Sequence, residues 1–566
     1  MMKNRISTKN KNKDKSCGNS LSSYLGFYIA LAVIATLFTN TTVDAADITD
    51  FIPIDSILYL QLNDINDLYT EIQISDSWDH AINNLFPEDE LEELQKGILF
   101  IQTILMTDPA TIIDTIGSRS GITFWNLSPE DLQGGLVIHS GGNLTELQKI
   151  TKILTGMMGT DADITFTLNA GEHEKVKYSS LQFQEIFVTF GFVSDFLVVG
   201  IGENSIETLI DTYRKKRPSL KKNNAYTKVE KKYGDGQFSI FMYAPEVLPK
   251  ISGLSDELQE QLQAFNTLFV NLNLLEGHRL IQLHTDFNPN LPENYISELL
   301  IKGTELESIN KATGDEALFI AISPNIVKTL WNILETEIET NANQDIYDFI
   351  TYIEGLLNLD LNNDIFPGLT GEYAISVDDF HQFDPSSIES LELELINTFT
   401  IDAANVDTNG GLLYIPSNID KWNQIQNSLS NLQNISVTKT EFNGTKVSRF
   451  ASNIHFAKKD SVSILSFSEN QTFSILDRIQ NRKKLTYFKG IPKNPLIVLH
   501  FDLLSFLQAH ANPHRLQNDG NEHEETSRIL AWIVVKDNEA VFKSILSDKD
   551  SPLEVMSKLI PLIQPF

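Results

Sequence analysis

Three histidines in the C-terminal part of the chain have side chains and spacing that suit a metal site. His510, His514 and His523 lie in the polar stretch AHANPHRLQNDGNEHEE, which ends in two glutamates. Imidazole and carboxylate groups bind transition metals, and two histidines four residues apart can share one face of a helix. Pro513 lies within that spacing and interrupts such a helix. These histidines are therefore the candidate metal ligands, and a solvated insertion is the alternative interpretation.

A second group of polar residues has the spacing that opens a calcium loop. Asp360, Asn362 and Asp364 occupy alternate positions. A calcium loop needs glycine at its sixth position and a bidentate glutamate at its twelfth, where this chain has Ile365 and Gly371. The residues are better explained as a polar start of a helix.

The stretch VVGIGENS, Val198 to Ser205, resembles the glycine-rich turn that brings a dinucleotide to the start of a helix. The third glycine is replaced by Ser205, and a related stretch, LSFSENQT, has Ser466 and Ser468 in place of the other two. We interpret both stretches as strand-to-helix turns, and expect no cofactor.

Motifs that identify enzymes directly are missing from the sequence. It contains no GxSxG elbow, no HExxH helix and no phosphate-binding GK(S/T) loop. Catalytic residues that converge from distant positions remain possible, because triads need not be close in sequence. The sequence itself gives no support for catalysis.

One strand-to-helix unit recurs along the chain. In FIPIDSILYLQLNDINDLYTEI, which begins at Phe51, three leucines alternate with other residues, as in a half-buried strand. Asn63 and Asp64 end the strand, and the apolar residues that follow have helical spacing. Degenerate copies of the unit begin at Gly234, Gly314 and Pro492.

Further matched blocks indicate a duplication. GGLVIHSGG at Gly134 resembles GGLLYIPSN at Gly410, and FLVVGIGENS at Phe196 resembles SILSFSEN at Ser463. The matched blocks keep their order, at a separation of roughly 250 to 275 residues. We therefore expect two similar domains, residues 46–303 and 304–566, after an N-terminal segment of residues 1–45.

Within each expected domain, alternating apolar strands are interrupted by helices at irregular intervals. A regular strand–helix alternation is missing. This favours an α+β fold, with two tandem halves of mixed or mainly antiparallel sheet packed with helices, over a doubly wound parallel sheet. Apolar spacing predicts helices at residues 90–105, 144–157, 205–213, 256–272, 325–338, 345–357 and 419–432.

The first 45 residues combine a basic segment with an apolar run. Six Lys and Arg residues precede Tyr24–Phe38, a run of 15 residues without charge. Small residues at Val43 and Ala45 fit a signal-peptidase cut before Ala46. The apolar run is short compared with the ~20 residues that span a bilayer. We expect an exported chain, either released by cleavage or anchored to the inner membrane by residues 21–38.

Composition argues against several classes of partner and site. The only cysteine, Cys17, precedes the predicted cut, so the processed chain has no disulfide and no thiolate site. The formal net charge is −31, and removing the basic segment makes it more negative. Such a charge repels nucleic acid and anionic membrane surfaces. We expect no nucleic-acid partner, and membrane contact only through an uncleaved N-terminal segment.

Two segments resemble the bacterial domain of unknown function 3352 family. They read IPIDSILYLQLNDINDL and LNLDLNNDIFPGLTGEYAISV, and the likeness covers most of residues 51–510. The resemblance implies an exported or membrane-anchored bacterial protein without an assigned activity. It concerns turns and strands, and so implies no site residues.

Three functional hypotheses follow. The first is a non-catalytic, periplasmic or secreted cell-envelope protein that acts as a binding or structural platform for a protein or envelope component. The second is a carrier of an apolar ligand in a cleft between sheet and helices. It is motivated by 33 phenylalanines, five of them in residues 183–196, which core packing also explains. The third is a metal-dependent hydrolase that uses the three histidines.

Overall fold

The computed structural model describes residues 47–74, 119–128, 130–158, 164–183, 186–234, 236–250, 255–274, 279–288, 295–312, 316–341, 344–378, 410–431, 437–450, 454–466, 469–481, 490–503, 505–506 and 528–546. The chain divides into two compact units. The first consists of Met1–Glu71 and Glu90–Thr227, and the second of Ile72–Asp89 and Lys228–Phe566.

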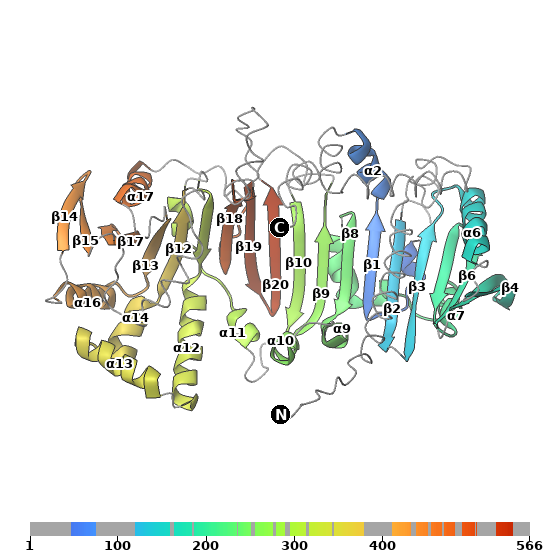
Figure 1. Ribbon diagram of the computed structural model, residues 1–566, viewed down its shortest axis with the longest axis horizontal. Helices are drawn as coiled ribbons and strands as arrows, with labels where there is room; N and C mark the ends of the chain where they lie inside the picture. Colours follow the sequence, from blue (N-terminus) through green and yellow to red (C-terminus); the bar gives the residue numbers. More distant parts are fainter. Residues whose placement is uncertain are drawn as a thin grey trace, which may run out of the picture. The chain divides into compact units, whose positions relative to one another are not determined.

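The first unit has an antiparallel sheet with the strand order β1-β2-β3-β7-β6-β5-β4 (Figure 1). Its strands are β1 (Leu58–Asn63), β2 (Arg119–Ser128), β3 (Asp131–His139), β4 (Ile164–His173), β5 (Val176–Phe183), β6 (Ile186–Val193) and β7 (Phe196–Ile201). Its helices include η1 (Ile48–Asp50), α6 (Leu144–Met158), α7 (Ser205–Tyr213) and η2 (Leu220–Lys222), while α2 (Ile65–Ile74) and α8 (Asn224–Tyr233) contain unit boundaries.

Strand β7 is buried along its whole length because apolar groups cover both of its faces. On one face, Leu197 and Val199 join a core cluster with Leu147 and Ile150 of α6. On the other face α7 packs closely, and a Cβ at Gly200 would lie 2.3 Å from the backbone nitrogen of Ile206. Only glycine allows this approach.

The second unit has an antiparallel sheet with the strand order β8-β9-β10-β20-β19-β18-β11-β12-β13-β17-β16-β15-β14. Its strands are β8 (Phe238–Tyr243), β9 (Phe265–Leu272), β10 (Arg279–Phe287), β11 (Leu318–Ile322), β12 (Gly371–Val377), β13 (Gly410–Pro416), β14 (Val437–Phe442), β15 (Thr445–Phe450), β16 (Ile454–Lys459), β17 (Val462–Ser466), β18 (Ile497–Asp502), β19 (Arg528–Lys536) and β20 (Glu539–Leu546).

Helices of the second unit follow several of these strands. They are α9 (Ala244–Val247), η3 (Leu248–Lys250), α10 (Asp256–Leu262), α11 (Tyr295–Leu299), η4 (Ser308–Lys311), α12 (Pro324–Asn341), α13 (Gln344–Leu357), η5 (Leu361–Ile365), α14 (Phe366–Leu369), α16 (Ile419–Ser430) and α17 (Glu469–Asn481). Every strand pairing among the described residues of either unit is antiparallel, so the fold is α+β and not doubly wound.

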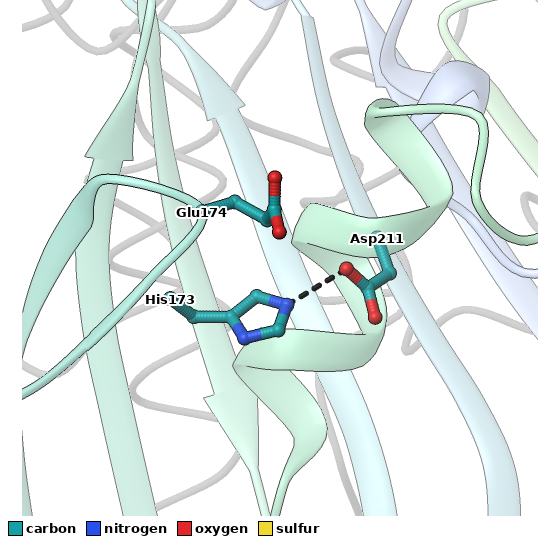
Figure 2. A group of neighbouring side chains, drawn as sticks. All are labelled: His173, Glu174 and Asp211. Atoms are coloured by element: carbon teal, nitrogen blue, oxygen red, sulfur yellow. Dashed lines mark hydrogen bonds and ion pairs between the residues drawn. The ribbon is translucent and has the colours of Figure 1, made fainter.

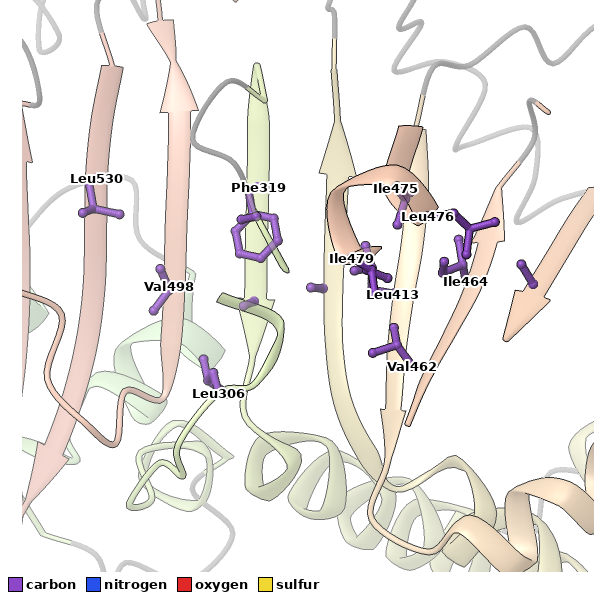
Figure 3. Close-up of a cluster of buried hydrophobic side chains, with 14 of the residues drawn as sticks. Leu306, Phe319, Leu413, Val462, Ile464, Ile475, Leu476, Ile479, Val498 and Leu530 are labelled. Atoms are coloured by element: carbon purple, nitrogen blue, oxygen red, sulfur yellow. The ribbon is translucent and has the colours of Figure 1, made fainter. Parts of the chain in front are cut away.

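One core cluster of the second unit packs α17 against the sheet (Figure 3). Ile475, Leu476 and Ile479 recur at helical spacing on α17 and pack with Leu413 and Ile464 of the strands below. The same cluster continues to Phe319 of β11 and Leu530 of β19. One apolar layer therefore joins strands that are far apart in sequence.

Most helices predicted from apolar spacing are confirmed. Elements α6, α7, α12, α13 and α16 match the predictions for residues 144–157, 205–213, 325–338, 345–357 and 419–432 within a few residues. The predicted helix at 90–105 lies outside the described residues, as does the N-terminal segment of residues 1–45. The division into two domains, residues 46–303 and 304–566, stays a prediction.

The prediction of one helix over residues 256–272 is wrong in its second half. Helix α10 ends at Leu262, and β9 begins at Phe265. In β9, Thr267, Phe269 and Asn271 are buried on one face, so the period is two rather than 3.6. Residues 265–272 form a strand because they hydrogen-bond to β8 on one side and to β10 on the other.

Candidate functional sites

The turn between β4 and β5 brings polar side chains onto α7. The turn consists of Glu174 and Lys175, with φ angles of 50° and 66°. A two-residue hairpin turn needs this left-handed conformation, which suits asparagine and glycine better than residues with long side chains. His173 is the last residue of β4, and the hairpin places it beside Asp211 of α7.

Three potential metal-binding side chains converge at this point (Figure 2). The His173 Nε2 atom lies 2.7 Å from Oδ1 of Asp211. One ligand atom from each of His173, Glu174 and Asp211 lies within 4.8 Å of the other two. Their side chains are 28%, 37% and 26% exposed, so a dissolved ion can reach them. We refer to these three residues as the hairpin cluster.

Lys216 supplies a positive charge to the hairpin cluster. Its ammonium group donates a hydrogen bond to Glu174 and lies 3.9 Å from Oδ1 of Asp211. This hydrogen bond lowers the pKa of the Glu174 carboxyl and raises the pKa of Lys216. Nearby, the Tyr178 hydroxyl donates to Glu207 over 2.5 Å, which raises the pKa of Tyr178 to about 12. The hairpin is therefore attached to α7 by polar contacts.

The second unit contains a groove with a volume of about 760 Å³. It lies between the ends of β10 and β19, the segment after α11, and one side of α12; Figure 1 shows these elements. Thr329, Asn332, Ile333 and Thr336 of α12 are spaced three or four residues apart, so they share the helix face that lines the groove. Its volume is in the range of known small-molecule sites.

The floor of the groove is apolar. Phe287 and Val535 line it and belong to a buried cluster that also includes Ile326 of α12. Leu300 and Ile301 pack against the same cluster. A ligand that displaces water from this floor gains free energy through its own apolar surface.

The mouth of the groove carries charges of both signs. Lys302, Glu298, Lys536 and Asp537 are exposed there. Lys536 and Asp537 lie 3.8 Å apart with side chains that are 82% and 84% exposed, so their attraction is weak. An apolar floor beneath a charged mouth suits an amphiphilic molecule.

Two hydrogen bonds fix the groove's shape. The Phe287 amide donates to the Asn538 carbonyl over 3.0 Å, and the Asn325 side chain donates to the Lys302 carbonyl over 2.7 Å. The first joins β10 to the turn after β19, and the second joins α12 to the opposite wall. The groove is thus preformed.

The metal site predicted at His510, His514 and His523 lies outside the described residues and stays a prediction. The polar start of a helix predicted at residues 360–364 is observed. Asp360 accepts a hydrogen bond from the Asn363 amide over 2.7 Å, and Asp364 pairs with Lys421 over 2.6 Å. The pairing lowers the pKa of Asp364.

The strand-to-helix turn predicted at residues 198–205 is also observed, with β7 leading through Gly202 into α7. Gly202 has a φ of 90°, and its amide donates to the Phe187 carbonyl over 2.8 Å. Of the phenylalanines at 183–196, Phe190 and Phe192 pack on the core cluster and Phe196 is 2% exposed. These three side chains serve packing, and the groove lies elsewhere in the chain.

Sequence reasoning missed both the hairpin cluster and the groove. Asp211 is 38 residues from His173, and neither spacing nor composition indicates that the hairpin meets α7. The groove combines side chains from residue 287 to residue 538. The only local signal was Glu-Lys in a two-residue turn, where asparagine or glycine is usual.

Comparison with protein families gives one match. The model described as "Protein of unknown function (DUF3352)" matches residues 149–452, which is more than half of the 566 residues. Neither the curated proteins nor the solved structures contain a match. Among the described residues, no helix is both long enough and apolar enough to cross a membrane.

Proposed function

The chain belongs to the DUF3352 family of proteins of unknown function, and we propose that it is an exported, non-catalytic binding protein of the bacterial cell envelope. Its ligand is an amphiphile whose apolar part lies in the groove between α11, α12 and the ends of β10 and β19. The observation that carries the proposal is the preformed groove of about 760 Å³ with an apolar floor and a charged mouth.

Export is supported by the sequence of the N-terminal segment. A basic stretch, an uncharged apolar run and small residues at Val43 and Ala45 occur in the order of a signal peptide. A protein that meets lipids or their fragments outside the cytoplasm also benefits from a strongly acidic surface, which keeps it soluble.

We also propose that the two halves of the chain arose by duplication. The order β1-β2-β3-β7-β6-β5-β4 recurs as β11-β12-β13-β17-β16-β15-β14. The register agrees as well, because Phe124 pairs with Leu58 and Gly134 just as Val377 pairs with Leu318 and Gly410. Such agreement supports a common ancestral unit.

The proposal is tested by adding palmitate to the delipidated protein. At a ligand concentration 100 times Kd, binding stabilises the folded chain by about 2.7 kcal/mol, which raises the melting temperature. Ile333→Asp places a charge in the groove and should abolish the rise. Leu330→Asp is the matched control, because Leu330 is 49% exposed on the same helix and does not line the groove. An unchanged melting temperature, or an equal response of Ile333→Asp, would contradict the proposal.

Native mass spectrometry of the gently purified protein extends the test. A mass lost on denaturation identifies the natural ligand, and a mature chain beginning at Ala46 or at Met1 distinguishes release from anchoring. A clean polypeptide mass favours a protein partner instead. The exposed Leu330, Tyr352 and Ile419 of α12, α13 and α16 are the contact residues to test in that case.

A further inference from the structure

We propose that the hairpin cluster, His173, Glu174 and Asp211, binds a first-row divalent cation such as Zn²⁺. The donor set is one imidazole nitrogen and two carboxylate oxygens, which zinc accepts in tetrahedral sites. Three protein ligands leave the fourth position to water. The proposal uses none of the residues that line the groove, and none of His510, His514 and His523.

Binding requires His173 and Asp211 to separate and lets Glu174, whose ligand atom lies within 4.8 Å of theirs, approach by at most about 1.4 Å. In a tetrahedral zinc site, neighbouring ligand atoms lie about 3.4 Å apart. The His173 Nε2 and Asp211 Oδ1 atoms are 2.7 Å apart, so they must separate by about 0.7 Å. His173 and Glu174 are at the tip of a hairpin, where a side-chain rotation supplies this displacement.

Lys216 supplies positive charge beside the two carboxylates of the hairpin cluster. Its ammonium group contacts Glu174 and lies 3.9 Å from Asp211, so it offsets the repulsion between the two carboxylates. A divalent ion must displace this ammonium group. Lys216 is therefore a competitor of the metal, and its removal should increase the metal affinity.

The β14–β15 hairpin of the second unit packs on its helix without residues like those of the hairpin cluster. Its turn is Asn443–Gly444, which suits the left-handed conformation, and it contacts α17 through stacked rings of Phe442 and Phe473, 4.5 Å apart. The Gln480 side chain of α17 also donates to the Asn443 carbonyl and to the Thr445 hydroxyl, each over 3.4 Å. Stacked rings and an amide side chain thus hold this hairpin to its helix without a group of residues that could bind a metal. The first hairpin instead has metal-binding groups on a less favourable turn.

The experiment is a zinc titration of the chelator-treated full chain by calorimetry. The background carries His510→Ala, His514→Ala and His523→Ala, so that those histidines do not contribute. We expect one Zn²⁺ per chain, with affinity at least tenfold weaker in His173→Ala and in Asp211→Asn. Asp477→Asn is the matched control on α17 and should bind as the background does.

Lys216→Met gives an independent result in the opposite direction. It should tighten zinc binding severalfold, and Co²⁺ in place of zinc should give the visible absorption of a tetrahedral site. Failure to bind one Zn²⁺ per chain, equal binding by His173→Ala, or no tightening in Lys216→Met would overturn the proposal. The hairpin cluster would then be an ionic contact between the hairpin and α7 only.

Discussion

At the scale of single residues, His284 of β10 shows how burial controls a charge. The side chain is 5% exposed and its ring lies 5.5 Å from that of Tyr233. Burial lowers the pKa of His284 to about 4, against a partial opposing effect of Asp286. Its Nε2 atom lies 3.3 Å from Glu539, so the neutral ring donates a hydrogen bond.

This lowered pKa predicts a loss of stability in acid. Between the unfolded pKa of 6.5 and the folded pKa of about 4, the unfolded chain binds a proton that the folded chain does not. His284 makes its full contribution to the free energy of unfolding above pH 6.5. This contribution decreases as the pH falls, by about 3 kcal/mol at pH 4. Urea unfolding of the wild type and His284→Gln from pH 7.5 to pH 4.5 measures it. A parallel decline of both proteins would contradict this assignment.

At the scale of elements, the β4–β5 and β14–β15 hairpins differ in turn chemistry. Lys175 has a φ of 66°, and Gly444 has a φ of 78° at the same position of its turn. The left-handed conformation is unfavourable for a residue with a Cβ. Lys175→Gly should therefore raise the free energy of unfolding by about 0.5 to 1 kcal/mol, and Gly444→Lys should lower it by a similar amount.

Both substitutions leave the hairpin cluster intact, so the zinc affinity of Lys175→Gly should not change. Thermal unfolding of the two variants beside the wild type is the measurement. If Lys175→Gly is less stable than the wild type, Lys175 makes a contact that outweighs its backbone strain.

Helices and strands were predictable from sequence where the apolar residues followed a single period. Helix α7 was predicted at its observed bounds because Ile206, Leu209 and Ile210 recur at helical spacing and are all buried. Residues 265–272 have apolar residues at the spacing of a helix and also at the spacing of a strand. Only their pairing with β8 and β10 makes them a strand. The α+β class, with mixed or mainly antiparallel sheet, followed from the irregular spacing of helices.

The candidate sites depend on contacts between elements, so sequence patterns did not reveal them. His173 and Asp211 meet because β4 and β5 form a hairpin beside α7. Phe287 and Val535 form the groove floor because β10 and β19 both pair with β20. Neither arrangement has a local signature, because side-chain spacing specifies elements and not their neighbours.

At the scale of the whole molecule, each compact unit has its own buried core. Leu147 of α6 is 1% exposed in the core cluster of the first unit, and Phe319 of β11 is 1% exposed in that of the second. The groove lies in the second unit. Damage to the two cores should therefore affect ligand binding differently.

Leu147→Ala should lower stability by about 2 to 5 kcal/mol and Phe319→Ala by about 3 to 5 kcal/mol, since both leave cavities. Only Phe319→Ala should also weaken binding of palmitate, because β11 also supplies Ile322, which packs on the apolar cluster of the groove floor. Calorimetric melting with and without palmitate measures both effects. If Leu147→Ala weakens palmitate binding as much as Phe319→Ala does, the groove depends on the core of the first unit and the two cores are not independent.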